Sequence, residues 1–383
     1  MLNTGQRYII IDKSQKPFLY KIYPQNKAIS TKSFIKKDNF AKIVFIKINM
    51  KRLILFAILC VAIIVMIGCA KNTTYTVIDG LTMGTTYHII HDHADTEKIK
   101  TGIDTVLAHI DNSLSVYNPN SIISKINNNE NVIVDSFFIE VFQRSREISS
   151  ITNGAFDISA SPLFNAWGFG FKNKESLTEE KIDSLKQFIG MENIWLEGNQ
   201  IAKSDSRVTI NANAVAKGFG VDAVARFLEH SGVENYIVEI GGEIRCKGKN
   251  SRGALWSVGI DKPIDGNMIA GENMQAIIRL SDKSLATSGN YRRYYEEEGK
   301  KYAHTINPVS GYPVSHNLLS ATVLASDCMS ADAFATAFMV MGLEKSKEFL
   351  ATHSDLGALL IYDNNGQLTT FATNNIKKLL HKK

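Results

Sequence analysis

The fold class of this 383-residue chain follows from Ala214-Val-Ala-Lys-Gly-Phe-Gly-Val-Asp-Ala-Val-Ala-Arg-Phe-Leu-Glu-His230 and from Tyr236-Ile-Val-Glu-Ile240, which comes directly after it. Apolar residues recur at helical spacing in the first segment and Gly232 follows it, so it predicts a helix. The second segment is a short apolar run typical of a buried strand. Further strands are expected in series at Trp256–Ile260, Gln275–Leu280, Leu319–Ala325 and Leu359–Tyr362. Strands in series, rather than in strict alternation with helices, predict an α+β fold with a largely antiparallel sheet.

The remaining segments add helices and hairpins to this core. Helical spacing is expected over residues 96–115, Ser136–Ile151, Thr178–Ile189, Ser330–Met341 and Glu344–Thr352. Strand patterns cover Tyr75–Ile90 with a break at Met83-Gly84, a hairpin around Gly198-Asn199, and the short run Val208–Ile210. The chain shows no repeat with a period of about 20–50 residues. We therefore expect one compact unit after the leader.

The basic charge of the chain is confined to its first residues. The formal net charge is +5, yet residues 1–52 contain 12 Lys and Arg against Asp12 and Asp38. From Cys69 onward there are 31 basic and 36 acidic residues, a net charge of −5. A basic stripe is the usual sign of a nucleic-acid partner. The sequence therefore predicts no nucleic-acid partner for the folded part.

A secretory leader is indicated between Met50 and Cys69. Met50-Lys-Arg precedes the apolar run Leu53–Ile67, and this run is short for a membrane-spanning helix, which needs about 20 residues. Met66-Ile-Gly-Cys69 resembles a bacterial lipobox, in which the cysteine is lipidated. An uncleaved membrane anchor is the alternative. We expect residues 1–49 to be a mis-annotated upstream extension, 50–69 a lipoprotein signal peptide, 70–80 a tether and 81–383 the folded domain.

The cysteines give little evidence of metal or redox chemistry. Cys60 lies in the apolar run and Cys69 at the lipobox, which leaves Cys246 and Cys328 for the folded domain. No CxxC pair or Cys/His zinc spacing is present. The two remaining residues could pair in an oxidising compartment, but we expect two separate buried thiols.

Two segments near the C-terminus carry groups suited to catalysis. His304-Thr-Ile-Asn-Pro-Val-Ser-Gly-Tyr-Pro313 forms a turn with one imidazole, and Ala331-Asp-Ala-Phe-Ala-Thr336 lies on a predicted helix. Asp332 and Thr336 are four residues apart and share a helix face. Hard oxygen ligands suit Mg²⁺ or Ca²⁺, and Mg²⁺ usually works beside phosphates. A histidine that accepts a proton beside a phosphate-bound metal suggests phosphoryl-type transfer. The alternatives are that His304 is a satisfied polar residue and that Asp332 caps a helix.

Three glycine-containing segments could cradle a ligand. Gly154-Ala-Phe-Asp-Ile-Ser-Ala-Ser-Pro-Leu163 permits backbone approach to a planar ligand, with core packing of its aromatic residue as the alternative. Asn211–Gly220 opens a helix whose free N–H groups favour phosphate, and Lys217 adds positive charge there unless it is simply solvated. Glu239-Ile-Gly-Gly-Glu-Ile244 ends a strand with a glycine pair, which an ordinary bulge would also explain. Neither a GxGxxG nor a Walker A motif occurs.

In their order along the chain, these segments resemble the ApbE family, the FAD:protein FMN transferases. The resemblance extends from about Leu81 to Gly342, nearly the whole chain after the leader. The matching pieces are Met83-Gly-Thr85, Asp111–Asn118, Gly154–Leu163, Ala214–Gly218, Gly241-Gly242, Ser288–Arg293, His304–Pro313 and Ala331–Thr336. Each is short, but together in this order they are specific. Three positions carry an amide where the family commonly has aspartate: Asn211, Asn290 and Asn307.

The resemblance implies a T-fold-like α+β core that binds FAD and Mg²⁺. It implies metal ligation by the side chains of Asp332 and Thr336, with backbone oxygens from Ala214 and Ala335, and a catalytic histidine at His304. It implies FAD contacts at Met83, Tyr117, Ala155, Phe156, Asp157, Asn211, Lys217 and Ile306.

The reaction and its setting are also implied by the resemblance. FMN would pass from FAD to a threonine or serine hydroxyl of a partner protein, typically a membrane redox subunit, with release of AMP. A histidine, whose pKa lies near neutrality, is suited to accept the hydroxyl proton. The protein is expected to be anchored by lipid to a cell-envelope membrane and to face the periplasm. An Mg²⁺-dependent FAD pyrophosphatase that yields FMN and AMP is one alternative, and a non-catalytic FAD-binding lipoprotein is another.

Overall fold

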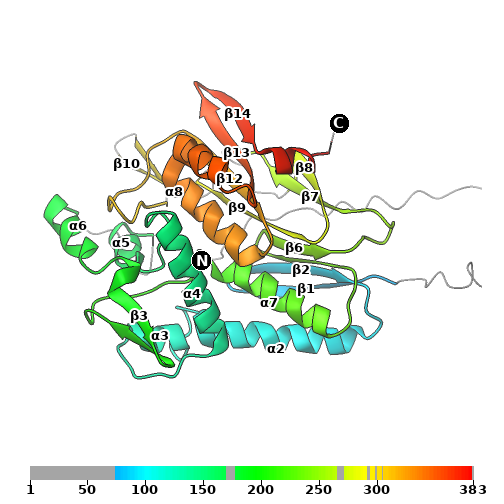
Figure 1. Ribbon diagram of the computed structural model, residues 1–383, viewed down its shortest axis with the longest axis horizontal. Coiled ribbons are helices and arrows are strands. Elements are labelled where there is room, and N and C mark those ends of the chain that lie inside the picture. The colour runs from blue at the N-terminus through cyan, green and yellow to red at the C-terminus, as the bar shows by residue number, and fades with distance from the viewer. Residues whose placement is uncertain are drawn as a thin grey trace, which may run out of the picture. The chain divides into compact units, whose positions relative to one another are not determined.

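An antiparallel sheet lies at the centre of the computed structural model, which describes residues 74–169, 177–264, 271–290, 294–297, 300–303 and 305–381 (Figure 1). Within these ranges the sheet has eight strands in the order β1-β2-β5-β6-β9-β12-β13-β14. Every neighbouring pair is antiparallel. The expected α+β class with a largely antiparallel sheet is therefore confirmed.

The strands of this sheet are β1 (Thr76–Thr82), β2 (Thr85–His91), β5 (Tyr236–Ile240), β6 (Glu243–Lys247), β9 (Lys283–Gly289), β12 (Leu318–Ala325), β13 (Gly357–Asn364) and β14 (Gln367–Ala372). The separate two-stranded pairs are β3 (Ile194–Glu197) with β4 (Gln200–Lys203), β7 (Trp256–Asp261) with β8 (Met274–Leu280), and β10 (Tyr294–Glu297) with β11 (Lys300–Ala303). The helices are α2 (Thr96–Leu114), α3 (Ile122–Asn127), α4 (Ser136–Ile151), α5 (Ser161–Ala166), α6 (Glu179–Lys186), η1 (Met191–Asn193), α7 (Ala216–His230), α8 (Cys328–Thr352) and α9 (Asn374–Lys377).

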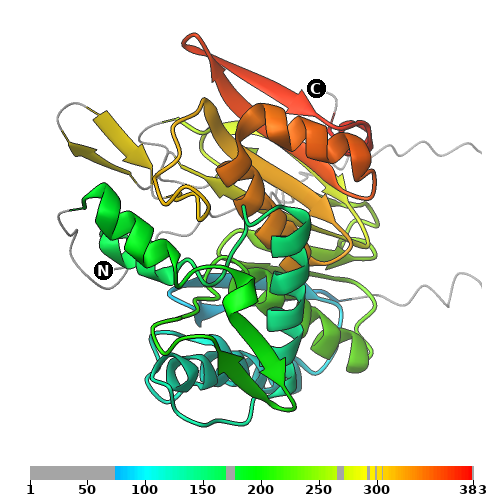
Figure 2. The same ribbon diagram turned by 60° about the vertical axis from the view of Figure 1, so that its left-hand side comes forward.

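The two faces of the sheet are covered by different elements. Side chains alternate along a strand, so Val238 of β5 packs in the larger apolar cluster while Ile237 packs in another. Helices α7 and α8 cover the first face, and α2 and α4 pack against them (Figure 1 and Figure 2). The hairpin β7–β8 and helix α9 supply residues of the cluster on the second face. The core is thus a sheet buried on both sides.

Two short turns bring the sheet close to the first turn of α7. Met83 (φ 49°) and Gly84 (φ 71°) join β1 to β2, and positive φ at both positions is typical of a type I′ hairpin turn. Gly241 (φ 61°) and Gly242 (φ 107°) join β5 to β6 in the same way. A Cβ on Gly241 would lie 2.8 Å from Cγ2 of Thr85, so the close contact of the two turns requires glycine.

Helix α8 is interrupted at Gly342, whose φ of 77° is not helical. Its two halves correspond to the helices expected at Ser330–Met341 and Glu344–Thr352. The imidazole of His316 lies against the break, where its Nε2 lies 2.9 Å from the carbonyl oxygen of Met339 and its Nδ1 accepts a hydrogen bond from the N–H of Leu318. The break is therefore a packed structural feature.

Some local expectations were wrong. Val208–Ile210 is not a strand, because side chains satisfy its backbone: Asn127 bonds both the N–H and the carbonyl of Ile210 at 2.8 Å, and Nζ of Lys203 donates to the carbonyl of Val208. Strand β9 was not expected, although it lies inside the sheet between β6 and β12. Its sequence is rich in small and hydroxyl residues and lacks an apolar alternation.

The cysteines of the folded domain follow the expectation. Cys246 and Cys328 are free and buried, and they belong to different apolar clusters. No helix in the described ranges is long and apolar enough to cross a membrane. The expected extension (1–49), the signal peptide with Cys69 and the first part of the tether lie outside the described residues.

Candidate active site

Asp332 of α8 caps the N-terminus of α7. The N–H of Gly218 donates to Oδ2 of Asp332 at 3.1 Å, and α7 receives no side-chain cap from its own N-cap residue Val215. A Cβ on Gly218 would overlap the carbonyl of Cys328 and lie 2.8 Å from Cβ of Asp332, so only glycine allows the two helices to come this close. The buried carboxylate is thereby held at the positive end of the α7 dipole.

Lys217 lies between two buried carboxylates. Its Nζ is 3.0 Å from Oε1 of Glu243, at the start of β6, and 3.8 Å from Oδ2 of Asp332. Both carboxylates are almost fully buried, whereas a quarter of the lysine side chain is exposed. Gly241 leaves room for the lysine, because a Cβ there would lie 3.2 Å from its Cδ. We call Lys217, Glu243 and Asp332 the acid–lysine cluster.

The environment of the acid–lysine cluster raises the pKa of both carboxyl groups and of the ammonium group. Burial raises the pKa of Asp332, while Lys217 and the Gly218 N–H act in the opposite direction. Burial also raises the pKa of Glu243; Lys217 lowers it and Asp332 raises it further. For Lys217 itself, burial lowers the pKa, but the attraction of Asp332 and Glu243 prevails and raises it. Two carboxylates thus share one ammonium group.

The residues of this site fit a divalent cation. Oε2 of Glu243 is a buried atom without a hydrogen-bond partner among the described residues, so the cluster has an oxygen that is unsatisfied there. Thr336 lies one turn after Asp332 on α8, and its Oγ1 is 3.4 Å from Oγ of Ser288 on β9. Ala214 precedes α7 by two residues, and Ala335 lies inside α8. Oxygen ligands of this kind suit Mg²⁺.

This predicted ligand set differs from a cluster of acidic or imidazole ligands. In the described part of the chain, no three or more His, Cys, Asp or Glu residues are grouped so that they could hold a metal ion. The predicted set has a single carboxylate, Asp332, completed by a hydroxyl and two carbonyl oxygens. Mg²⁺ usually keeps several waters and binds through one or two carboxylates plus substrate phosphates, which is compatible with so few protein charges.

Residues 211–213 join two of the predicted FAD-contacting segments. The N–H of Asn211 donates to the carbonyl of Ile158 at 2.7 Å, which ties this segment to Gly154–Leu163. Oδ1 of Asn211 accepts from the N–H of Asn213, and Nδ2 of Asn213 donates to the hydroxyl of Tyr117 at 3.3 Å. Tyr117 remains 69% exposed, so its ring is accessible to a ligand. The structure therefore brings Tyr117, Asn211 and the Gly154 segment together.

Within the Gly154 segment, the side chains of Ala155 and Phe156 are buried, and Phe156 belongs to the main core. Only their backbone can face a ligand. Asp157 accepts hydrogen bonds from the N–H and the hydroxyl of Ser159, at 2.7 and 2.6 Å. Burial raises the pKa of Asp157 to about 6, against the lowering effect of these hydrogen bonds.

The turn after residue 304 packs on the same segment. Nε1 of Trp167 donates to the carbonyl of Gly311 at 2.9 Å, and Val309 lies against Gly154. Ile306 is 1% exposed, so its backbone alone is available to a ligand. His304, the predicted catalytic residue, lies outside the described residues. The turn that follows it is thus fixed beside Gly154 and Trp167.

Met83 lies in the β1–β2 turn and contacts α7. Its Cε would be 2.6 Å from a Cβ on Gly220, so the methionine covers the helix one turn beyond Lys217. Its side chain is half-buried. Met83 and the acid–lysine cluster therefore both lie at the first turns of α7.

Sequence reasoning missed two polar residues of this site. Glu243 was noted only as part of Glu239–Ile244, and Ser288 only as part of Ser288–Arg293. The available signal for Glu243 was an acid placed directly after a glycine pair. Its meaning depends on the β5–β6 turn, which places the acid opposite Lys217.

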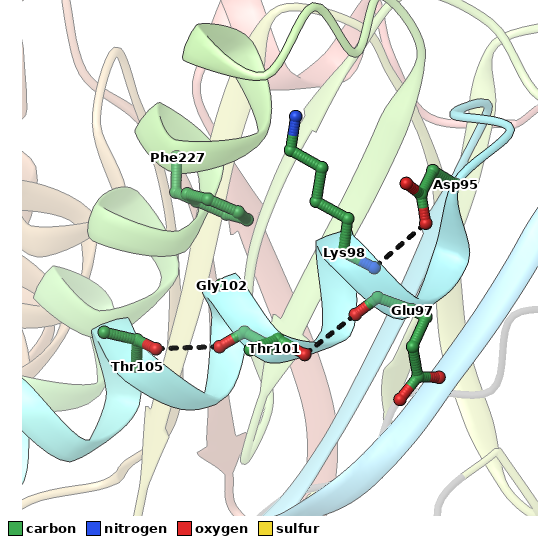
Figure 3. A pocket seen from close by; sticks show the side chains of 7 residues that line it. All are labelled: Asp95, Glu97, Lys98, Thr101, Gly102, Thr105 and Phe227. Atoms are coloured by element: carbon green, nitrogen blue, oxygen red, sulfur yellow. Dashed lines mark hydrogen bonds between the residues drawn. The ribbon is translucent and has the colours of Figure 1, made fainter.

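A surface hollow of about 570 Å³ lies elsewhere, between the first half of α2 and Phe227 of α7 (Figure 3). Its walls include the charged side chains of Asp95, Glu97 and Lys98, and Gly102 makes room for the Phe227 ring. None of the predicted site residues lines this hollow.

The fold and the acid–lysine cluster define a class of protein: an antiparallel α+β domain whose helix N-terminus and buried carboxylates suit a phosphate ligand with a divalent cation. The model of the ApbE family matches residues 83–360, and the chain belongs to this family. The resemblance inferred from the motifs is thereby confirmed.

Two relatives with similar sequences carry the same name. The chain is 34% identical over 330 residues to the FAD:protein FMN transferase of Vibrio cholerae, covering 84% of this chain and 97% of that protein. It is 36% identical over 349 residues to the FAD:protein FMN transferase of Haemophilus influenzae, covering 87% of this chain and 100% of that protein.

Solved structures with a similar fold are also flavin transferases. The flavin transferase ApbE from Vibrio cholerae matches with a TM-score of 0.72 at 34% identity, over 80% of this chain and 99% of that chain. The flavinyl transferase ApbE of Pseudomonas stutzeri, in its apo form, matches with a TM-score of 0.72 at 28% identity, over 80% and 96%. The fold expected from the resemblance is confirmed.

Proposed function

We propose that this chain is an FAD:protein FMN transferase, which moves FMN from FAD to a threonine or serine hydroxyl of a partner protein and releases AMP. The names of its relatives support the activity. The observation in this chain that carries the proposal is the acid–lysine cluster at the N-terminus of α7. A helix N-terminus beside a lysine favours a phosphate group, and the two carboxyl groups next to the lysine favour a cation.

The proposed reaction exchanges one phosphorus–oxygen bond for another. The acceptor hydroxyl oxygen attacks the phosphorus on the FMN side of the pyrophosphate, and a new P–O bond forms there. The bond from this phosphorus to the bridging oxygen breaks, and AMP leaves with that oxygen. The hydroxyl proton passes to the imidazole of His304, since general base catalysis by histidine typically contributes about 10²–10⁴-fold. The assignment of His304 is supported by the motif resemblance.

Mg²⁺ would be held by the side chains of Asp332 and Thr336 with the carbonyl oxygens of Ala214 and Ala335. When bound, it would neutralise charge on the pyrophosphate oxygens. Lys217 and the positive end of the α7 dipole would orient the same phosphates. The backbone of Ala155, Phe156 and Ile306, together with Tyr117 and Met83, would position the rest of FAD; Asp157 and Asn211 supply polar contacts.

The expected cellular location is part of the same proposal. Lipidation at Cys69 would hold the domain at a cell-envelope membrane, facing the periplasm, next to a membrane redox subunit that carries the acceptor hydroxyl. Labelling cells with a fatty-acid probe tests this part, because a Cys69→Ala variant should lose both the label and the membrane fraction.

Incubation with FAD, Mg²⁺ and a flavin-acceptor domain tests the activity. We expect flavin fluorescence to follow the acceptor band in a denaturing gel and AMP to appear in equal amount. An acceptor whose hydroxyl residue is replaced by alanine should give neither product. AMP and free FMN without a labelled band would show an FAD pyrophosphatase instead, and bound FAD without AMP would show a non-catalytic binding protein.

A further inference from the structure

Lys217 and a divalent cation would compete for the carboxylate of Asp332. The ammonium group already forms a long ion pair with Oδ2 of Asp332, at 3.8 Å, and a small movement would shorten it. The same oxygen already accepts the Gly218 N–H. An ammonium group moved onto this carboxylate would add a second donor and a positive charge at the position where a cation is needed.

Glu243 resolves this conflict in the structure. Its Oε1 lies 3.0 Å from Nζ of Lys217, closer than Asp332, and its other oxygen, Oε2, has no hydrogen-bond partner in the described part of the chain. Glu243 is also rigidly placed, because it pairs with Ile240 across the two-residue Gly241-Gly242 turn and is buried. The lysine is therefore drawn toward β6 and away from α8.

We infer that Glu243 is a positioning residue that holds Lys217 away from Asp332 and so keeps the Asp332 carboxylate available to the divalent cation. This inference rests on the proposed function for the identity of the cation site. It assigns a role to a side chain that the predicted FAD and metal contacts did not include.

A charge-preserving substitution separates this role from simple electrostatics. Glu243→Asp keeps the negative charge but withdraws it by roughly 1.5 Å, the length of one C–C bond, so Lys217 is released toward Asp332. We expect Mn²⁺, used alone as a paramagnetic probe of the full chain, to bind about tenfold more weakly, or worse, in an electron paramagnetic resonance titration. Unchanged Mn²⁺ affinity in this variant would overturn the inference.

A double-mutant cycle tests whether the effect passes through the lysine. Lys217→Met removes the competing cation, so this variant should bind Mn²⁺ about threefold more tightly, or better, in the absence of FAD. In the Lys217→Met background, Glu243→Asp should change Mn²⁺ affinity by less than about twofold. An equal loss in both backgrounds would show that Glu243 acts on the metal directly, which contradicts the inference.

Glu229→Asp is the matched control. Glu229 is likewise a glutamate between α7 and the sheet: it lies on α7, accepts a hydrogen bond from the Tyr236 hydroxyl and lies 3.4 Å from Arg245, away from the acid–lysine cluster. Its shortening should leave Mn²⁺ affinity unchanged, and circular dichroism should confirm that each variant is folded. Absence of Mn²⁺ binding by the wild-type chain would contradict the proposed metal site and remove the basis of the inference, whereas normal binding by both wild type and Glu243→Asp contradicts the inference alone.

Discussion

The N–H of Gly218 and the carboxylate of Asp332 form a hydrogen bond of 3.1 Å that joins the first turn of α7 to α8. The bond satisfies one of the free N–H groups of α7 and fixes the carboxylate beside Lys217. A single contact thereby links helix capping, helix–helix packing and the placement of a predicted metal ligand.

Gly218→Ala should disrupt this contact. Its Cβ would overlap the backbone carbonyl of Cys328, which cannot rotate away, so α7 must move from α8. Overpacking of this kind typically costs about 1–3 kcal/mol, and urea unfolding should show a loss in this range. Gly220→Ala is the control: its Cβ would meet the flexible end of Met83, so its stability should fall less. Equal losses for the two variants would contradict the close-approach argument.

Asp332→Asn should abolish metal binding without lowering the stability of the metal-free protein. Without metal, the variant should be as stable as the wild type or more stable, because one of two buried carboxylates that share a lysine is neutralised. Millimolar Mg²⁺ should raise the melting temperature of the wild type but not of the variant. The rate of FMN transfer should fall by about 10²-fold or more, because a bound metal ion contributes several kcal/mol to charge stabilisation and would be lost with its ligand.

Asp327→Asn is the comparison for that experiment. Asp327 caps α8 through a 2.8 Å hydrogen bond from the N–H of Ser330 and lies on the same helix. Its substitution should cost less than about 1 kcal/mol in stability, because asparagine caps a helix about as well as aspartate, and it should leave the Mg²⁺-dependent rise in melting temperature intact. A loss of that rise in both variants would mean that the metal response reports on α8 in general.

Elements with strong periodicity were predictable from the sequence. Helix Ser136–Ile151 and strand Tyr236–Ile240 have the expected bounds, because their apolar residues alone specify which face is buried. Strand β9 could not be found in this way. Its Ser284 and Thr287 are buried although they are polar, and this burial depends on the completed sheet and on the elements packed on its faces.

The candidate site was predictable to the extent that its residues lie in motifs. Asp332 and Thr336 share a helix face by their spacing, and Lys217 lies at a predicted helix start. Glu243 was missed because its partner is distant in sequence and the two meet only through the β5–β6 turn. Phe156 and Ile306 were expected to contact FAD, but their side chains are buried in the core, so burial limits them to backbone contacts.

Asp157→Asn should change how stability depends on pH. The folded protein raises the pKa of Asp157 to about 6 from its ordinary value of 3.8, mainly by burial. The folded state therefore holds the proton more tightly than the unfolded state, and stability from this group is present below about pH 4 and lost as the pH rises through 6. The amide oxygen can still accept both hydrogen bonds from Ser159.

We expect the Asp157→Asn variant to exceed the wild type in stability at pH 7 by up to about 3 kcal/mol, since each pKa unit corresponds to 1.36 kcal/mol. Near pH 4 the two proteins should be equally stable. Urea unfolding at both pH values measures this difference. A gain of the same size at both pH values would show that the carboxyl charge is not its source.

Gly342→Ala should destabilise α8 at its break. Gly342 has a φ of 77°, which disfavours any side chain, and a Cβ there would also lie 2.9 Å from Cδ2 of His316. His316 cannot give way freely, because its Nε2 is held at 2.9 Å from the carbonyl oxygen of Met339.

Gly232 is the control, because its φ is 82° and nothing lies within 4 Å of its Cβ position. Thermal unfolding should show a loss of about 1 kcal/mol for Gly232→Ala and about 2–4 kcal/mol for Gly342→Ala, the excess arising from overpacking. Equal losses would mean that backbone strain alone explains the glycine, and that contact with the imidazole adds no cost.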